Sequence, residues 1–142
     1  MASTNFTNLP RNLALGRHVF GTDTLKVLLV SSVPSEANFD AWVSRADVTN
    51  EITGTGYSAG GIAQAYSLDA LDTTNNRQSI TLTNITNGWS ASTFSALGAI
   101  VFKNSGTAST DYLVSFIDFA GTVSCTNGTF SITYSSPLYI NR

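Results

Sequence analysis

The first long hydrophobic run of the chain is apolar on both of its faces. Residues 24–30 read Thr-Leu-Lys-Val-Leu-Leu-Val and follow the turn residues Gly-Thr-Asp at 21–23. A run of this length and composition predicts a strand, and its two-sided apolar character predicts a central position in a sheet. Residues 97–103, Leu-Gly-Ala-Ile-Val-Phe-Lys, have the same character within a predicted strand 96–103. We therefore expect these two strands to lie beside or opposite each other.

Shorter apolar patterns predict the remaining strands, at residues 62–68, 78–83, 111–119, 129–134 and 137–140. The segment 129–134 alternates cleanly, which predicts that Phe130, Ile132 and Tyr134 point inward. Pro137 cannot donate to a ladder, so 137–140 is predicted to be a short edge strand or a tail that pairs elsewhere.

Turn-forming residues separate these strands, at 72–76, 84–89, 104–110, 120–122 and 126–128. Strands at regular intervals with turns between them predict an all-β fold. We expect a single antiparallel β-sandwich, Ig-like or jelly-roll-like, with a small barrel as the alternative.

The first third of the chain is less regular. Within residues 35–43, Phe39 and Trp42 stand at helical spacing behind a cap at Ser35 or Asn38, which predicts one short helix over one end of the sheets. Residues 1–22 contain only scattered apolar positions, so we expect an extended N-terminal arm that docks on the domain or on a neighbour. One helical turn after Pro10 is the alternative. The predicted organisation is an arm, 1–22, and a single β-sandwich domain, 23–142.

The segment 51–61 holds a cluster of glycines that resembles a phosphate-binding loop. Its Gly-Thr-Gly-Tyr-Ser-Ala run is a tolerable match to a dinucleotide site, and Asp72 stands at about the distance of a ribose-binding acid. Such a loop opens a helix, whereas residues 62–68 have strand periodicity. We interpret the glycines as a chain reversal at positive φ. A β-branched residue at Gly56 or Gly60 should then damage folding.

Composition narrows the range of partners. Only 11% of the residues are charged, the net charge is −2 and there is no basic run, which argues against nucleic-acid binding. No apolar run is long enough to predict a membrane-spanning helix, so no membrane partner is expected. The single Cys125 cannot form an internal disulfide, and we expect the chain to be made in a reducing cytosol. A weakly charged exterior rich in Ser, Thr and Asn suits a surface that other subunits cover.

Residues able to carry catalysis are few. His18 is the only histidine, and no nucleophile motif surrounds it. Asp111 and Asp118 are seven positions apart on one predicted strand, which puts them on opposite faces and argues against a glycosidase pair. One histidine and one cysteine do not make a zinc site. We predict no enzyme activity, no catalytic or metal-binding residues and no cofactor.

Oxygen-bearing side chains gather in one predicted turn, at Asp69, Asp72, Asn75 and Asn76. They could hold a calcium ion, but their spacing is not that of an EF-hand. The preferred interpretation is a solvated turn.

Four segments together carry a family resemblance. They are 21–30, Gly-Thr-Asp-Thr-Leu-Lys-Val-Leu-Leu-Val; 51–61, Glu-Ile-Thr-Gly-Thr-Gly-Tyr-Ser-Ala-Gly-Gly; 89–103, from Trp-Ser-Ala-Ser-Thr-Phe to Val-Phe-Lys; and Asp-Phe at 118–119 with Thr-Asn-Gly-Thr-Phe at 126–130. Over residues 12–134 the chain resembles a widespread family of small tailed-bacteriophage virion proteins. It departs from the family at Leu28, where Ala is commoner, and at Phe102, where the family has Tyr.

The resemblance implies a non-enzymatic structural component of a bacteriophage particle. It points to a head decoration or cement protein that clamps neighbouring major capsid subunits, commonly as a homotrimer on the capsid surface of the virion, after synthesis in the host cytoplasm. A tail, baseplate or adaptor protein is the alternative. A third hypothesis is a carbohydrate-binding module that stacks sugars on Trp42, Trp89 or Tyr57.

The chain termini are the segments expected to make assembly contacts. The predicted interface residues belong to the arm and to the C-terminal tail: Phe6, Leu9, Arg11, Leu138, Tyr139 and Ile140. On this interpretation, deleting residues 1–12 weakens attachment to particles and leaves the isolated domain folded.

Overall fold

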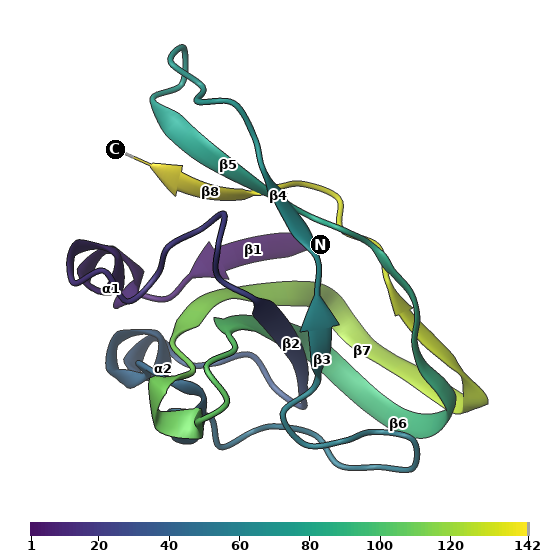
Figure 1. Cartoon of the computed structure of the whole chain (residues 1–142). Coiled ribbons are helices and arrows are strands. Elements are labelled where there is room, and N and C mark those ends of the chain that lie inside the picture. Colours follow the sequence, from purple (N-terminus) through teal and green to yellow (C-terminus); the bar gives the residue numbers. More distant parts are fainter. Residues whose placement is uncertain (142) are drawn as a thin grey trace.

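The computed structural model describes residues 1–141, which form two β-sheets packed face to face with short helices at one end (Figure 1). The strands are β1 Ala2–Asn5, β2 Leu25–Val30, β3 Ile62–Gln64, β4 Tyr66–Leu68, β5 Arg77–Leu82, β6 Ile85–Lys103, β7 Leu113–Ile132 and β8 Leu138–Asn141. The helices are α1 Leu9–Ala14 and α2 Glu36–Ala41, with 3-10 turns η1 Arg45–Asp47 and η2 Ala108–Thr110. The predicted all-β sandwich is confirmed, with two short helices instead of one.

One sheet has five strands in the order β1-β7-β6-β2-β3, and the other has three in the order β4-β5-β8. All the pairings are antiparallel. In the larger sheet β2 lies between β6 and β3, and its register runs from Leu25 opposite Lys103 to Val30 opposite Gly98. The predicted central position of β2, and its place beside the second apolar run, are therefore confirmed.

Strand β2 is apolar on both faces because the larger sheet is covered on both sides. Leu25, Val27 and Leu29 belong to the core between the sheets, together with Ile80 of β5 and Leu138 of β8. The alternate residues, Leu28 and Val30, belong to a second core with Phe39 of α2 and Trp42 at its end.

Helix α2 begins where the sequence predicted a cap. The Asn38 backbone N–H donates to Ser35 Oγ at 3.2 Å, and the Ser35 N–H donates to Asn38 Oδ1 at 2.9 Å. This reciprocal capping box satisfies donors at the first turn and fixes the start of the helix. Phe39 is thereby held against the outer face of the larger sheet.

Strands β6 and β7 form one long ribbon, so the turns predicted at 84–89, 120–122 and 126–128 are wrong as chain reversals. The turn-like residues produce irregular pairing instead. Positive φ occurs at Ala91 (48°), Ala120 (60°) and Asn127 (47°), and the register shifts repeatedly along the ribbon. Bulges of this kind bend a strand without ending it. The predicted inward positions in the last part of β7 hold, since Phe130 and Ile132 are buried.

The predicted strand 62–68 is divided between the two sheets. β3 pairs with β2 in the larger sheet, and β4 pairs with β5 in the smaller one, with only Ala65 between them. The chain therefore passes directly from the edge of one sheet to the edge of the other (Figure 1).

The N-terminal segment is part of the sandwich. β1 pairs with β7 from Ala2 opposite Asp118 to Asn5 opposite Ser115, and residues 9–14 form α1. Phe6 packs with its ring centroid 5.2 Å from that of Phe39. The expectation of an extended arm is thus wrong for residues 9–14, where the helical alternative after Pro10 is the observed one.

The glycine-rich segment reverses the chain against β2 and β6. Gly54, Gly56, Gly60 and Gly61 all have positive φ, as the reversal requires. Inside the turn, Glu51 Oε1 accepts hydrogen bonds from the Tyr57 hydroxyl at 2.7 Å and the Gly60 N–H at 2.6 Å. The carboxylate therefore holds the loop closed.

Candidate assembly surface

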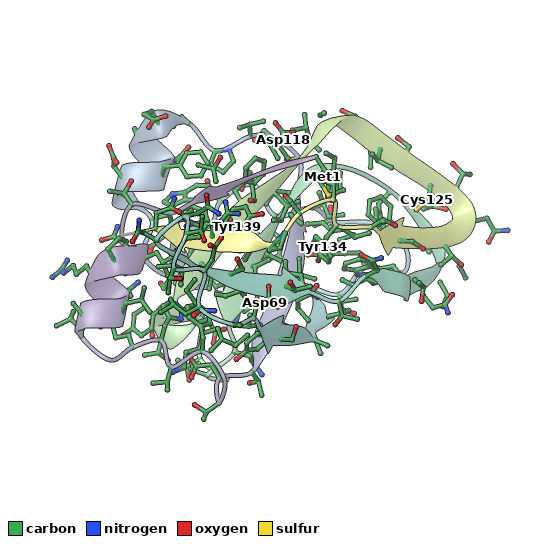
Figure 2. All side chains as sticks on the ribbon, turned by 90° about the horizontal axis from the view of Figure 1, so that it is seen from above. Met1, Asp69, Asp118, Cys125, Tyr134 and Tyr139 are labelled. Carbon is green, nitrogen blue, oxygen red and sulfur yellow. The ribbon has the colours of Figure 1, made fainter. Side chains whose placement is uncertain are left out.

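The two chain ends, which the sequence singled out separately, lie side by side. Asn5 Nδ2 donates to the Tyr139 carbonyl oxygen at 2.8 Å, and Ser135 Oγ donates to the Met1 carbonyl oxygen at 3.0 Å. Both bonds join residues 134 positions apart, so β1 and β8 run in the same direction. Figure 2 shows the two strands next to each other, with Met1 and Tyr139 labelled.

Three of the six predicted interface residues are interior. Phe6, Leu9 and Leu138 are 1%, 2% and 1% exposed, because the chain uses them in its own core. Almost none of their side-chain area is therefore open to a second chain, although Phe6 and Leu9 still line one of the cavities described below. Of the others, Arg11 is exposed, and Tyr139 and Ile140 are half-buried.

Two open cavities flank the end of β8, and Ile140 and Asn141 line both of them. The first, about 370 Å³, lies against the N-terminal segment and is lined also by Leu9 and Leu13. The second, about 350 Å³, lies against the loop between β4 and β5, where Leu71 is 66% exposed. Both volumes are within the range of small binding pockets.

We call the region around these cavities the terminal surface. It consists of partly or fully exposed residues from β1, α1, the loop after β4, and β8: Ser3, Asn5, Arg11, Leu71, Tyr139, Ile140 and Asn141.

Arg77 lines the second cavity and is held in place by two contacts. Its Nε is 3.1 Å from Asp72 Oδ2, and its guanidinium carbon lies 3.9 Å from the centre of the Tyr139 ring. Asp72 also accepts from the Asn75 N–H at 3.0 Å and from Asn75 Nδ2 at 2.7 Å. Hydrogen bonds from Asn75, and then from Arg77, lower the pKa of Asp72.

The turn considered for calcium is held by its own hydrogen bonds. Besides the bonds to Asp72, Asp69 Oδ2 accepts from Thr81 Oγ1 at 2.8 Å. Within residues 1–141, no group of three or more His, Cys, Asp or Glu side chains is arranged to hold a metal ion. The carboxylates therefore shape the loop that carries Leu71.

His18 is enclosed by the protein, and its side chain has no exposed area. Nε2 is 3.3 Å from the Leu113 carbonyl oxygen, so Nε2 carries the hydrogen and donates it. The ring stacks on Phe20 at 5.3 Å, and Nδ1 is 3.8 Å from Asp23 Oδ2. Burial is the main cause that lowers the pKa of His18. The residue therefore packs as a neutral imidazole.

The aromatic residues considered for sugar stacking belong to the core. Trp42 and Trp89 are 7% and 3% exposed, and Trp89 packs against Phe130 at 5.8 Å. The Tyr57 hydroxyl donates to Glu51 and accepts from the Leu29 N–H at 3.1 Å. Burial raises the pKa of Tyr57. Since a sugar needs an open ring face, the two tryptophans do not form the stacking platform that the third hypothesis requires.

Three comparisons with known proteins, against family models, curated proteins and solved structures, each found no match. Among residues 1–141, none of the helices has the length and apolar character needed to cross a membrane.

Proposed function

We propose that the chain is a non-enzymatic structural subunit of a bacteriophage particle. In this role it is a decoration or cement protein that binds as a homotrimer on the capsid surface and links neighbouring major capsid subunits. The observation that carries the proposal is the convergence of both chain ends on the terminal surface, beside two open cavities. The phage context comes from the sequence resemblance.

The placement of the ionisable side chains supports a structural role. Asp111, 1% exposed, accepts from Arg45 Nε at 2.9 Å and from the Ser105 N–H at 2.7 Å. Asp118 accepts from the Ala120 N–H at 2.8 Å, beside the bulge in β7. These two carboxylates, which the sequence already argued against as a glycosidase pair, each fix a separate piece of backbone.

On a lattice of identical sites, contacts that are individually weak are sufficient for stable attachment. Each copy of a symmetric decorating oligomer presents the same surface to the shell, so several weak contacts act together and the effective affinity exceeds that of one. A small terminal surface of mainly uncharged and apolar groups, with the exposed Arg11 and the paired Arg77 and Asp72 beside them, suits this mode of binding.

The proposal is tested on purified particles of the phage whose genome encodes the chain. Quantitative mass spectrometry should find the protein at a copy number of the same order as the major capsid protein. Cryo-electron microscopy should place it as threefold density outside the shell. Density on the tail would replace the capsid role with the tail or baseplate alternative, and absence from purified particles would refute a virion role.

A further inference from the structure

The two sheets are closed along one side and open along the other. On the closed side the chain runs from β3 through Ala65 into β4. On the open side, β1 is the edge of the larger sheet and β8 is the edge of the smaller one. We call the region between β1 and β8 the seam.

The free backbone groups of β1 are those of Ser3 and Asn5. The Phe6 N–H donates to the Val114 carbonyl oxygen at 3.2 Å, which makes that pair a hydrogen-bonded one. Hydrogen-bonded and non-hydrogen-bonded pairs alternate along an antiparallel ladder, so Thr4 also faces β7. The N–H and C=O groups of Ser3 and Asn5 therefore point away from β7.

The same reasoning assigns the free groups of β8. The Asp69 N–H donates to the Ser79 carbonyl oxygen at 3.1 Å, so the backbone groups of Ser79 face β4. Its neighbours on β5 then face β8, where they pair with Leu138 and Ile140. The N–H and C=O groups of Tyr139 and Asn141 are left pointing outward. The bond from Asn5 Nδ2 to the Tyr139 carbonyl agrees with this assignment.

Residues of both strands line one cleft, in which the Tyr139 carbonyl oxygen already accepts from Asn5 Nδ2. A cavity of about 300 Å³ is lined by Ser3, Thr4, Asn5, Tyr139 and Asn141. Neighbouring strands of a sheet are about 4.8 Å apart, too close for a side chain to stand between their backbones. Because the Asn5 amide bridges the seam, β1 and β8 are farther apart than paired strands. The two strands are also parallel to each other, so one strand antiparallel to both could pair with both after displacing the Asn5 amide from the Tyr139 carbonyl.

We propose that the seam binds an extended segment of the major capsid protein, about four residues long and antiparallel to β1 and β8. The inference rests on the proposed function and specifies how the subunit attaches. Only an extended backbone offers alternating donors and acceptors along both of its edges, as the seam requires. The added strand joins the two sheets into one continuous barrel wall.

Two further features match this occupant. The 370 Å³ cavity shares Asn5 and Asn141 with the seam and is lined by Phe6, Leu9 and Ile140, so it can take a large apolar side chain of the bound strand. Exposed edge strands are normally blunted by charge or proline. β1, Ala-Ser-Thr-Asn, and β8, Leu-Tyr-Ile-Asn, contain neither, and the nearest proline, Pro137, lies just before β8.

A second copy of the chain is a poorer occupant. In residues 1–141, each strand is already paired within its own sheet, so a copy would have to break such pairing in order to donate one. A capsid subunit can supply a loop or a terminal segment without breaking any strand pairing of the present chain.

Proline substitutions at the free positions test the seam without breaking the existing ladders. Ser3→Pro and Tyr139→Pro each remove an N–H that points into the cleft, and proline is tolerated at such edge positions. The matched controls, Ser3→Ala and Tyr139→Ala, make the same side-chain loss and keep the N–H. On particles assembled without the native protein, the double proline variant should bind at least about tenfold more weakly than the double alanine variant. Equal binding by the two folded variants overturns the proposal.

Hydrogen exchange provides a readout specific to strand addition. In the free protein, the backbone amides of Ser3, Asn5, Tyr139 and Asn141 should exchange rapidly. They should become protected when the protein attaches to particles. The same protection is expected with synthetic peptides that together cover the major capsid protein, for those peptides that bind. Attachment without this protection overturns the seam and leaves the proposed function standing. Failure of the native protein to attach overturns both. If these amides become protected when the concentration of the protein alone is raised, without particles or peptides, the seam is occupied by a second copy of the chain and the proposal is overturned.

Discussion

Gly61 is the position where the fold leaves least room for a side chain. It immediately precedes β3 and has φ of +63°. A Cβ atom there would lie 1.8 Å from the Val27 carbonyl oxygen and 2.8 Å from Leu28 Cα, both in the backbone of β2. Gly60, which the sequence had singled out, is less constrained, since its Cβ would meet only the ends of two long side chains, Arg45 at 3.4 Å and Lys26 at 4.0 Å.

Two effects add for the substitution Gly61→Ala. An alanine in the left-handed region costs about 1–2 kcal/mol. Relief of the contact with Val27 requires β3 to move away from β2, which loses about two hydrogen bonds at about 1 kcal/mol each. The expected loss is about 3–4 kcal/mol in the free energy of unfolding, a large part of the 5–15 kcal/mol typical of a domain. Gly16→Ala is the matched control, because Gly16 has φ of +66° and nothing within 4 Å of its Cβ position.

Urea unfolding followed by tryptophan fluorescence measures both variants, since Trp42 and Trp89 are buried and report on the folded core. With an m-value of about 2 kcal/mol/M, Gly61→Ala should lower the midpoint by about 1.5–2 M, and Gly16→Ala by less than about 1 M. If the two variants lose the same free energy of unfolding, the contact of the added Cβ with the Val27 backbone does not affect stability, and the reasoning is refuted.

Two further predictions concern stability. Burial holds the folded-state pKa of His18 below its value of 6.5 in the unfolded chain, so the unfolded state binds a proton first and stability should fall as the pH drops below about 6.5. In thermal melts between about pH 7 and pH 5, His18→Gln should lose most of this decline; an unchanged slope would assign it to other groups. Deleting residues 1–12 should unfold the protein, because it removes Phe6, Leu9 and β1, and one buried Phe alone is worth about 3–5 kcal/mol. A native far-UV circular dichroism spectrum for the truncated chain would contradict this.

Local patterns predicted the elements whose character does not depend on distant partners. The two-sided apolar runs of β2 and β6 identified the centre of the larger sheet, and the Ser35 cap identified the start of α2. The ribbon was missed because a residue such as Asn127 can make either a turn or a bulge. Which one forms is decided by whether the flanking segments share a partner strand, and this is a tertiary property.

The terminal surface was only partly accessible from the sequence. Apolar residues near the ends were chosen as contacts, but Phe6 and Leu138 are drawn into the core by pairing with distant strands. The polar residues Asn5 and Asn141, which face the seam, were missed. Which backbone groups remain free depends on strand register, and a sequence does not reveal register without knowledge of each strand's neighbour.

The pairing of β1 with β7 also limits the order in which the strands can pair while the chain is being synthesised. Residues 2–5 are synthesised well before their partners, residues 115–118. β1 therefore stays unpaired until β7 has been synthesised. Such long-range closure places folding at the slow, millisecond-to-second end for small domains. A newly made chain thus acquires both walls of its seam only after β7 and β8 have been made.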